Sequence, residues 1–187
     1  MANGYTTEAP ADVYAGLRAE TSQSFTEANV KRGTQHEFST YTPAFVGVSR
    51  IIIKTGALPL SIKSATYRFD GEGISVKTSL VTSFTGGTLA TVYNRNFKNP
   101  VAPLVEIYTL PATVVIGAQQ STEKTFLGST TTGGRVLSTS DVDAPGLETI
   151  LDRNSIYVTE ITSLEVDPQN LAVYATWYEG ELDLPRP

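Results

Sequence analysis

Apolar and polar side chains alternate most clearly between residues 57 and 81. Tyr67 and Phe69 fall on one face of an extended chain, and apolar residues recur in the same way over residues 74–81, after Asp-Gly-Glu-Gly at residues 70–73. A period of two is typical of half-buried strands, and the glycines suit a tight antiparallel connection. This segment therefore predicts two paired strands. The polar residues expected to face away from the core are Thr66, Arg68, Ser75, Lys77 and Ser79.

The same alternation, interrupted by Gly and Pro, continues along the chain. Further strands are expected over residues 45–54, 89–93, 104–110, 113–116, 122–127, 156–164 and 171–178. In the last of these, Trp177 shares a face with Leu171 and Val173, which places the chain's single Trp in the core. Roughly eight to nine strands without βαβ spacing predict an all-β protein, specifically an antiparallel β-sandwich of jelly-roll type.

Composition agrees with one all-β domain. The chain has 187 residues, and 9 Tyr and 7 Phe accompany abundant Thr, residue types that favour pleated surfaces. Only 18% of the residues are charged, which is low for a helical protein whose solvent faces need such side chains.

Residues 1–37 differ from the rest and predict an extended N-terminal arm, followed by a β-sandwich domain over residues 38–187. The arm is largely polar from residue 21 onward, and it permits one short helix after residues 9–12. It is either a loosely ordered terminus or an arm that docks on a neighbouring subunit. In the second interpretation its anchors are Val13, Tyr14, Leu17 and Phe25.

Several functional classes lack the residues that they need. The chain has no Cys, so it has no disulfide, thiol nucleophile or Cys-based metal site. We expect no secretory signal, because the chain opens without a basic segment followed by an apolar one. We expect no membrane contact, because no apolar run approaches the length of a membrane span. The net charge of −5 is scattered rather than clustered, so no nucleic-acid partner is expected.

Candidate catalytic and metal-binding residues are few. His36 is the single histidine and is expected on the surface, where it is a poor general base for a hydrolytic triad. The carboxylate pairs Asp70 with Glu72 and Asp141 with Asp143 lie in Gly- or Pro-rich turns, where acidic residues serve the backbone. Calcium at the second pair is conceivable, but a longer ligand series is missing.

No catalytic residue, cofactor or metal is therefore assigned, and the chain is not expected to be an enzyme. Glu160 and Glu165 are expected to face water.

Three residues near strands are candidate contacts with other subunits. Tyr174 and Tyr178 share the face opposite Trp177, and they suit a platform for sugar, a subunit interface or packing between sheets. Arg95 lies between two Asn residues and either forms a structural salt bridge or reaches a neighbouring subunit.

Four short motifs, taken in order, resemble a set of small β-sandwich virion proteins of tailed bacteriophages. They are Phe-Thr-Gly-Gly-Thr at residues 84–88, Tyr-Asn-Arg-Asn at 93–96, Asn-Ser-Ile-Tyr at 154–157 and Trp-Tyr-Glu at 177–179. The resemblance covers about residues 49–180. It implies a capsid decoration (cement) protein, which binds the outside of an assembled head and forms a homotrimer. The implied partners are the major capsid protein and other copies of this chain, in a virion assembled in the bacterial host cytoplasm.

Three functional hypotheses follow. The first is a non-enzymatic decoration protein that clamps capsid subunits, with its arm adding avidity. The second is a neck or tail component, or a receptor- or carbohydrate-binding module of a tail appendage. A glycan site would cluster exposed aromatic rings with polar partners in a cleft, whereas a cement protein would present a flat contact face. A hydrolase has the least support.

Overall fold

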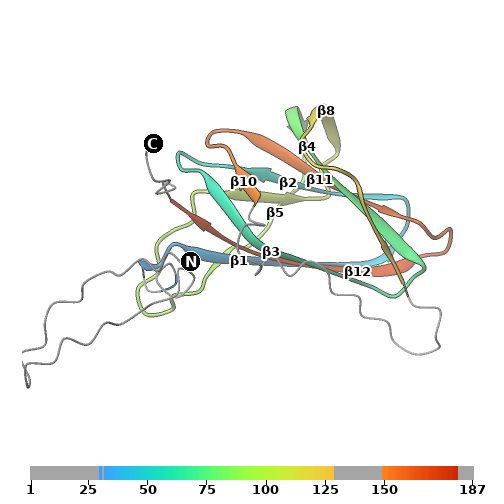
Figure 1. The fold of residues 1–187 in the computed structure, drawn as a ribbon, viewed down its shortest axis with the longest axis horizontal. Helices are drawn as coiled ribbons and strands as arrows, with labels where there is room; N and C mark the ends of the chain where they lie inside the picture. Colours follow the sequence, from blue (N-terminus) through green and yellow to red (C-terminus); the bar gives the residue numbers. More distant parts are fainter. Residues whose placement is uncertain (1–29, 31, 129–148, 181–187) are drawn as a thin grey trace, which may run out of the picture.

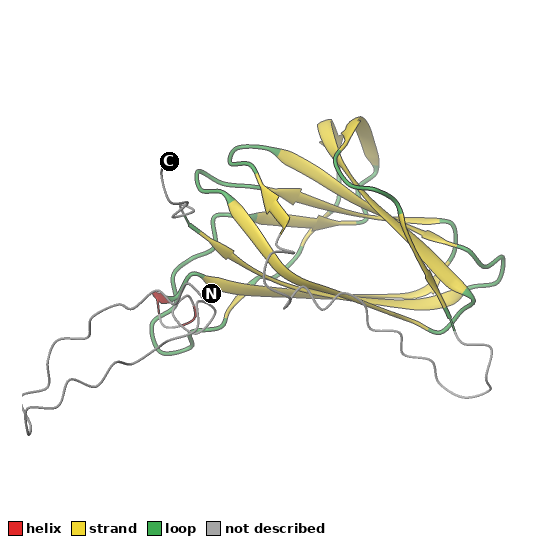
Figure 2. Cartoon of the chain, viewed as in Figure 1, coloured by secondary structure: helices red, strands yellow, loops and turns green. Residues whose placement is uncertain are grey.

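A computed structural model of the chain describes residues 30, 32–128 and 149–180. These residues form two antiparallel sheets that pack against each other as a β-sandwich (Figures 1 and 2). The predicted fold class is thereby confirmed, while the jelly-roll winding stays a prediction. The proposed short helix, the four arm anchors Val13, Tyr14, Leu17 and Phe25, and the pair Asp141 and Asp143 lie outside the described residues.

The first sheet, sheet A, has five strands. In spatial order they are β10 (Thr149–Leu151), β3 (Leu60–Phe69), β12 (Gln169–Glu179), β1 (Gln35–Phe45) and β6 (Tyr93–Asn94).

The second sheet, sheet B, has seven strands. Six of them follow in the order β5 (Thr88–Leu89), β7 (Glu106–Thr109), β2 (Val48–Lys54), β11 (Ile156–Ser163), β4 (Gly73–Thr85) and β8 (Thr113–Gln119). The seventh, β9 (Lys124–Leu127), pairs with the first part of β4.

The predicted pairing of the strands around residues 70–73 is wrong, because β3 and β4 lie in different sheets. Both strands have the expected apolar face, with Phe69 and Ile74 buried in one core cluster. Alternation identifies the buried face of a strand but not its neighbour in the sheet. The connection instead crosses between the sheets and is held to β12, where Asp70 accepts hydrogen bonds from the backbone N–H and the side-chain amide of Asn170, both at 2.6 Å.

The main core lies between the sheets. Trp177 is 2% exposed and packs in one cluster with Leu171 and Val173, which confirms its predicted position. Most of the remaining buried members come from β1 and β3 of sheet A and from β4 and β11 of sheet B, so both sheets contribute to one apolar layer.

A second, smaller cluster covers part of the outer face of sheet B. Ile52, Val81 and Val158 are buried there beneath partly buried neighbours that include Phe84 and Val114. Ser75 and Ser79 are also buried, in contrast to the prediction that they face solvent. The sequence pattern missed this because it assumed that only one face of β4 is covered.

The β-sandwich begins earlier in the chain than residue 38, the predicted boundary between the N-terminal arm and the sandwich domain. β1 starts at Gln35, and Gln35 and His36 are both buried. Gly33 precedes the strand with a φ of 76°, and a Cβ at this position would lie 2.7 Å from the backbone oxygen of Asn99. A glycine is therefore required where the chain enters the sheet.

Replacing Trp177 with Ala is expected to lower the free energy of unfolding by about 3–5 kcal/mol, because a large buried side chain is lost from the inter-sheet core. Urea unfolding followed by circular dichroism measures this without relying on the fluorescence of the chain's single Trp. Val166, which is 92% exposed, provides the control, and Val166→Ala should change stability by no more than about 0.5 kcal/mol. A loss below about 1 kcal/mol for Trp177→Ala would contradict the placement of this ring in the core.

Candidate functional site

One buried carboxylate connects the end of β12 to the chain that enters sheet B. The side chain of Glu179 accepts a hydrogen bond from the backbone N–H of Leu104 at 2.7 Å and another from that of Val105 at 3.2 Å. The indole N–H of Trp177 donates to the same carboxylate at 3.3 Å. A carboxylate that accepts several N–H bonds forms strong, charge-assisted contacts. No sequence pattern indicated this role, because Glu179 and Leu104 are far apart along the chain.

His36 lies in the interior and not on the surface, which corrects the sequence-based prediction. It is 1% exposed, and its ring stacks on that of Trp177 with 6.1 Å between the ring centroids. Burial lowers the pKa of His36 below its ordinary value, and the nearby carboxylate of Glu179 opposes this only in part. The sequence interpretation failed because it extended the polar character of the arm to residues that already belong to β1.

The loop over residues 95–104 is fixed by asparagine side chains. The amide of Asn94 donates to the backbone oxygens of Gly33 at 2.5 Å and Val101 at 2.8 Å. The side-chain oxygen of Asn96 accepts from the backbone N–H of Lys98 and of Asn99. Short polar side chains that bond to nearby backbone groups in this way stabilise turns. The loop is therefore held in one conformation at its start, while the carboxylate of Glu179 holds its end.

This fixed loop presents apolar side chains to solvent. Phe97 is 85% exposed. Other exposed apolar residues lie on the loop or on the neighbouring edge strand β6, and we call the whole set the loop patch: Tyr93, Phe97, Val101 and Leu104. An exposed phenyl ring on a well-anchored loop is a feature of protein interfaces, where preformed aromatic anchors supply much of the affinity.

Arg95 and Tyr174 meet at one carboxylate on the outer face of sheet A. The hydroxyl of Tyr174 donates to Glu37 at 2.8 Å, and the guanidinium of Arg95 lies 3.7 Å from the same carboxylate. Partial burial raises the pKa of Tyr174, and the hydrogen bond to Glu37 raises it further. Arg95 was expected either to form a structural salt bridge or to reach a neighbouring subunit. The structure shows a salt bridge within the chain, to Glu37.

Tyr178 does not join this group. It is buried, and the ammonium of Lys63 lies 4.4 Å from the centre of its ring. A cation over an aromatic face is a stabilising contact. Tyr178 is therefore packed within the chain, which is one of the roles considered for it, and its role as a subunit contact stays a prediction.

Glu160 is also buried, which corrects the expectation that it faces water. Its carboxylate forms ion pairs with Arg50 at 3.0 Å and Lys77 at 3.4 Å on the two strands that flank β11. A buried charge needs such partners. Glu160 lies directly opposite Arg50 on β2 and Lys77 on β4. The alternation of apolar and polar residues does not show which residues on neighbouring strands lie opposite one another.

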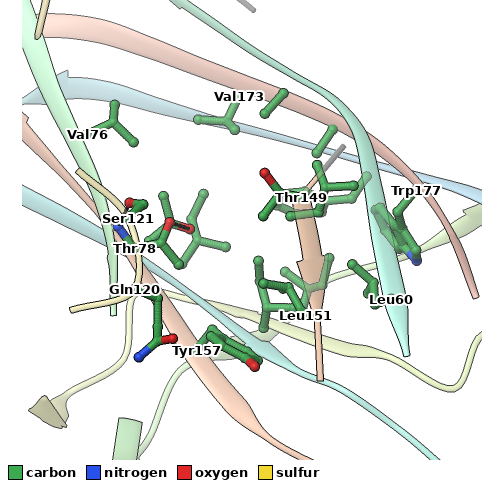
Figure 3. A pocket seen from close by; sticks show the side chains of 18 of the residues that line it. Leu60, Val76, Thr78, Gln120, Ser121, Thr149, Leu151, Tyr157, Val173 and Trp177 are labelled. Atoms are coloured by element: carbon green, nitrogen blue, oxygen red, sulfur yellow. Dashed lines mark hydrogen bonds between the residues drawn. The ribbon is translucent and has the colours of Figure 1, made fainter. Parts of the chain in front are cut away.

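A cavity of about 280 Å³ lies between the two sheets (Figure 3). Its lining is mostly apolar and includes Leu60, Val76 and Trp177, and polar side chains such as Thr78 and Ser121 lie on one side. A pocket of this size is at the small end of the range for ligand sites. Much of its lining belongs to the main core, so we assign it to inter-sheet packing.

Within the described residues, no three or more His, Asp or Glu side chains are grouped as metal ligands. No helix in this part of the chain is both long and apolar enough to cross a membrane. Comparisons of the whole chain with protein-family models, curated proteins and solved structures found no match.

The depressed pKa of His36 predicts pH-dependent stability. Its folded-state pKa lies below the unfolded value of about 6.5, so the unfolded chain takes up the proton first as the pH falls. The free energy of unfolding should therefore decrease between about pH 7.5 and about pH 5.5, with a slope of at most about 1.4 kcal/mol per pH unit. Urea unfolding at several pH values measures this slope.

His36→Gln supplies the control, because this variant has no imidazole to titrate. Its stability should change less over the same pH range than that of the unmodified chain. NMR gives a direct reading, since the chain has one histidine and its ring proton signals need no assignment. A ring titration midpoint at or above about 6.5 would contradict the buried position.

Proposed function

We propose that this chain is a non-enzymatic structural virion protein, which binds the outside of an assembled phage capsid and stabilises it by bridging capsid subunits. The observation that carries this proposal is the exposed ring of Phe97 on a loop fixed by Asn94, Asn96 and Glu179. A preformed loop loses little conformational entropy when it binds, so its apolar contacts contribute more of their energy to affinity.

The position of the loop patch also supports a role in contacts between proteins. It lies beside β6, a short strand at the edge of sheet A, so a partner can approach it from the side of the sandwich. Three of its four members, Phe97, Val101 and Leu104, lie within the 95–104 loop, so this short segment carries several exposed apolar side chains. Apolar and aromatic side chains gathered in this way mark interaction sites.

The strand order supports the jelly-roll type that the strand pattern of the sequence predicts. In sheet A, β10-β3-β12-β1 follow one another, and in sheet B, β2-β11-β4 are followed by β9. Consecutive strands such as β1 and β2, or β11 and β12, lie in opposite sheets. We propose that this arrangement is a jelly-roll winding, a type that is common in viral capsid proteins.

We further propose that the functional unit is a homotrimer and that the N-terminal arm, which precedes β1, reaches neighbouring subunits. The order of the four motifs within residues 84–179 supports the link to phage decoration proteins. Linked contacts of several copies would add avidity to a modest individual contact.

Phe97→Ala is expected to weaken the binding of the purified protein to phage heads that lack it, by about tenfold or more, because the anchoring ring is removed. Co-sedimentation with such heads, at increasing protein concentration, measures the saturation ratio and the apparent affinity. The matched control is Val166→Ala, since Val166 is as exposed as Phe97 but lies between β11 and β12, at the opposite end of the sandwich (Figure 1).

Equal binding of the two variants would contradict the assignment of the contact to the loop patch. If the unmodified chain does not bind heads at all, the capsid proposal fails, and the same assay with purified necks and tails tests the alternative location.

A further inference from the structure

The outer face of sheet A contains a groove of about 660 Å³, and no member of the loop patch lines it. Its side chains come from three adjacent strands in two rows. In one row Tyr41 of β1, Ala172 of β12 and Arg68 of β3 lie opposite one another. In the next row the partners are Ser39, Tyr174 and Thr66. Small and large side chains therefore alternate across the face, and the small ones form the floor between two tyrosines and an arginine.

The two aromatic rings are held in place by hydrogen bonds at their hydroxyl groups. Tyr41, which is 62% exposed, donates to the side-chain oxygen of Asn170 at 2.8 Å, and Asn170 is fixed in turn by Asp70. Tyr174 donates to Glu37 at 2.8 Å. Diagonal neighbours on adjacent antiparallel strands are separated by about 7–8 Å, which is on the scale of a short oligosaccharide. The ring faces are thus preorganised, and little side-chain entropy is lost when a ligand covers them.

The groups beside the rings are hydrogen-bonding groups. Ser39 and Thr66 contribute hydroxyls, and the guanidinium of Arg68 has no ion-pair partner among the residues that the structure describes. The carboxylates of Asp70 and Glu37 are engaged by Asn170, Tyr174 and Arg95. The groove therefore offers apolar ring faces together with several donors and acceptors, and this combination is complementary to a sugar ring, which has an apolar C–H face and a rim of hydroxyls.

Other ligand classes fit the groove less well. A nucleic acid needs a positive face, whereas here Arg68 and Arg95 are balanced by Glu37 and Asp70. An added peptide strand needs an open sheet edge, but β1, β12 and β3 are all interior strands of sheet A. An acidic sugar would bring its carboxylate close to Glu37 and Asp70. These considerations favour a neutral glycan.

We propose that the outer face of sheet A is a binding site for a neutral, hexose-containing oligosaccharide, with Tyr41 and Tyr174 as stacking platforms and Arg68 as the main hydrogen-bond donor. This site goes beyond capsid binding and does not depend on it. A decoration protein with such a site would present a sugar-binding surface on the outside of the particle. The same site would serve a receptor-binding module equally well, so its test uses the free protein and no phage heads.

The experiment is an NMR titration of the ¹⁵N-labelled full chain with defined hexasaccharides: a β-1,4-glucan, an α-1,4-glucan, a β-1,4-linked N-acetylglucosamine and an α-1,6-mannan. We expect saturable shifts from at least one of them, confined to backbone amides of β1, β3 and β12 around the groove. Tyr41→Ala should then weaken binding by about tenfold. Tyr41→Phe keeps the ring and should retain most of the affinity.

Two further variants make the assignment specific. Arg68→Gln should weaken binding while leaving the strands unchanged, because the Arg68 side chain is exposed. Phe97→Ala, on the loop patch, should bind sugar like the unmodified chain, so failure of the capsid proposal and failure of this one are distinguishable. The proposal is overturned if none of the four sugars produces saturable shifts, if the shifts map elsewhere, or if Tyr41→Ala binds as tightly as the unmodified chain.

Discussion

The structure depends on one buried carboxylate. Glu179 at the end of β12 accepts hydrogen bonds from the backbone of Leu104 and Val105 and from the indole of Trp177. The two backbone donors belong to the segment that leads into β7 of sheet B, and the indole donor lies in the main core. A buried carboxylate requires such donors, and buried backbone N–H groups equally require an acceptor. The carboxylate therefore joins the two sheets at one end of the sandwich, and the ring of its donor Trp177 stacks on that of the interior His36.

This interaction also fixes the surface to which we assign the capsid contact. The 95–104 loop is anchored at its start, where the backbone N–H of Arg95 donates to Gln35 at 2.9 Å, and at its end by Glu179. Close packing adds a further constraint, because a Cβ at Gly56 would lie 2.7 Å from the backbone oxygen of Leu104. Both ends of the loop that carries the exposed Phe97 are therefore held to the sandwich. The residues that line the groove around Tyr41 are not members of the loop patch, so the two proposed functions use different side chains.

Local alternation predicted the fold class, the apolar faces of β3 and β12 and the core position of Trp177, because each of these properties is set by neighbours along the chain. It did not predict which strands pair, and it placed His36 and Glu160 in water. The partners of those two side chains come from distant parts of the sequence, so no local pattern indicates them. Two of the candidate contacts, Arg95 and Tyr174, meet at the carboxylate of Glu37, which no pattern singled out. Their role as contacts with other subunits stays a prediction. Apart from the Asn residues around it, no sequence pattern singled out Phe97.

Backbone amide hydrogen exchange tests the role of Glu179 most directly. In the unmodified chain, the amide protons of Leu104 and Val105 should be strongly protected, although Leu104 lies in an exposed part of the loop. In Glu179→Gln, one of the two acceptor oxygens becomes an amide N–H₂ group that cannot accept. Exchange at these two amides should then accelerate selectively, while the amides of β11 in the centre of sheet B remain protected. Fast exchange at both amides in the unmodified chain, or no change in the variant, would contradict the claim that this carboxylate holds the loop to the sandwich.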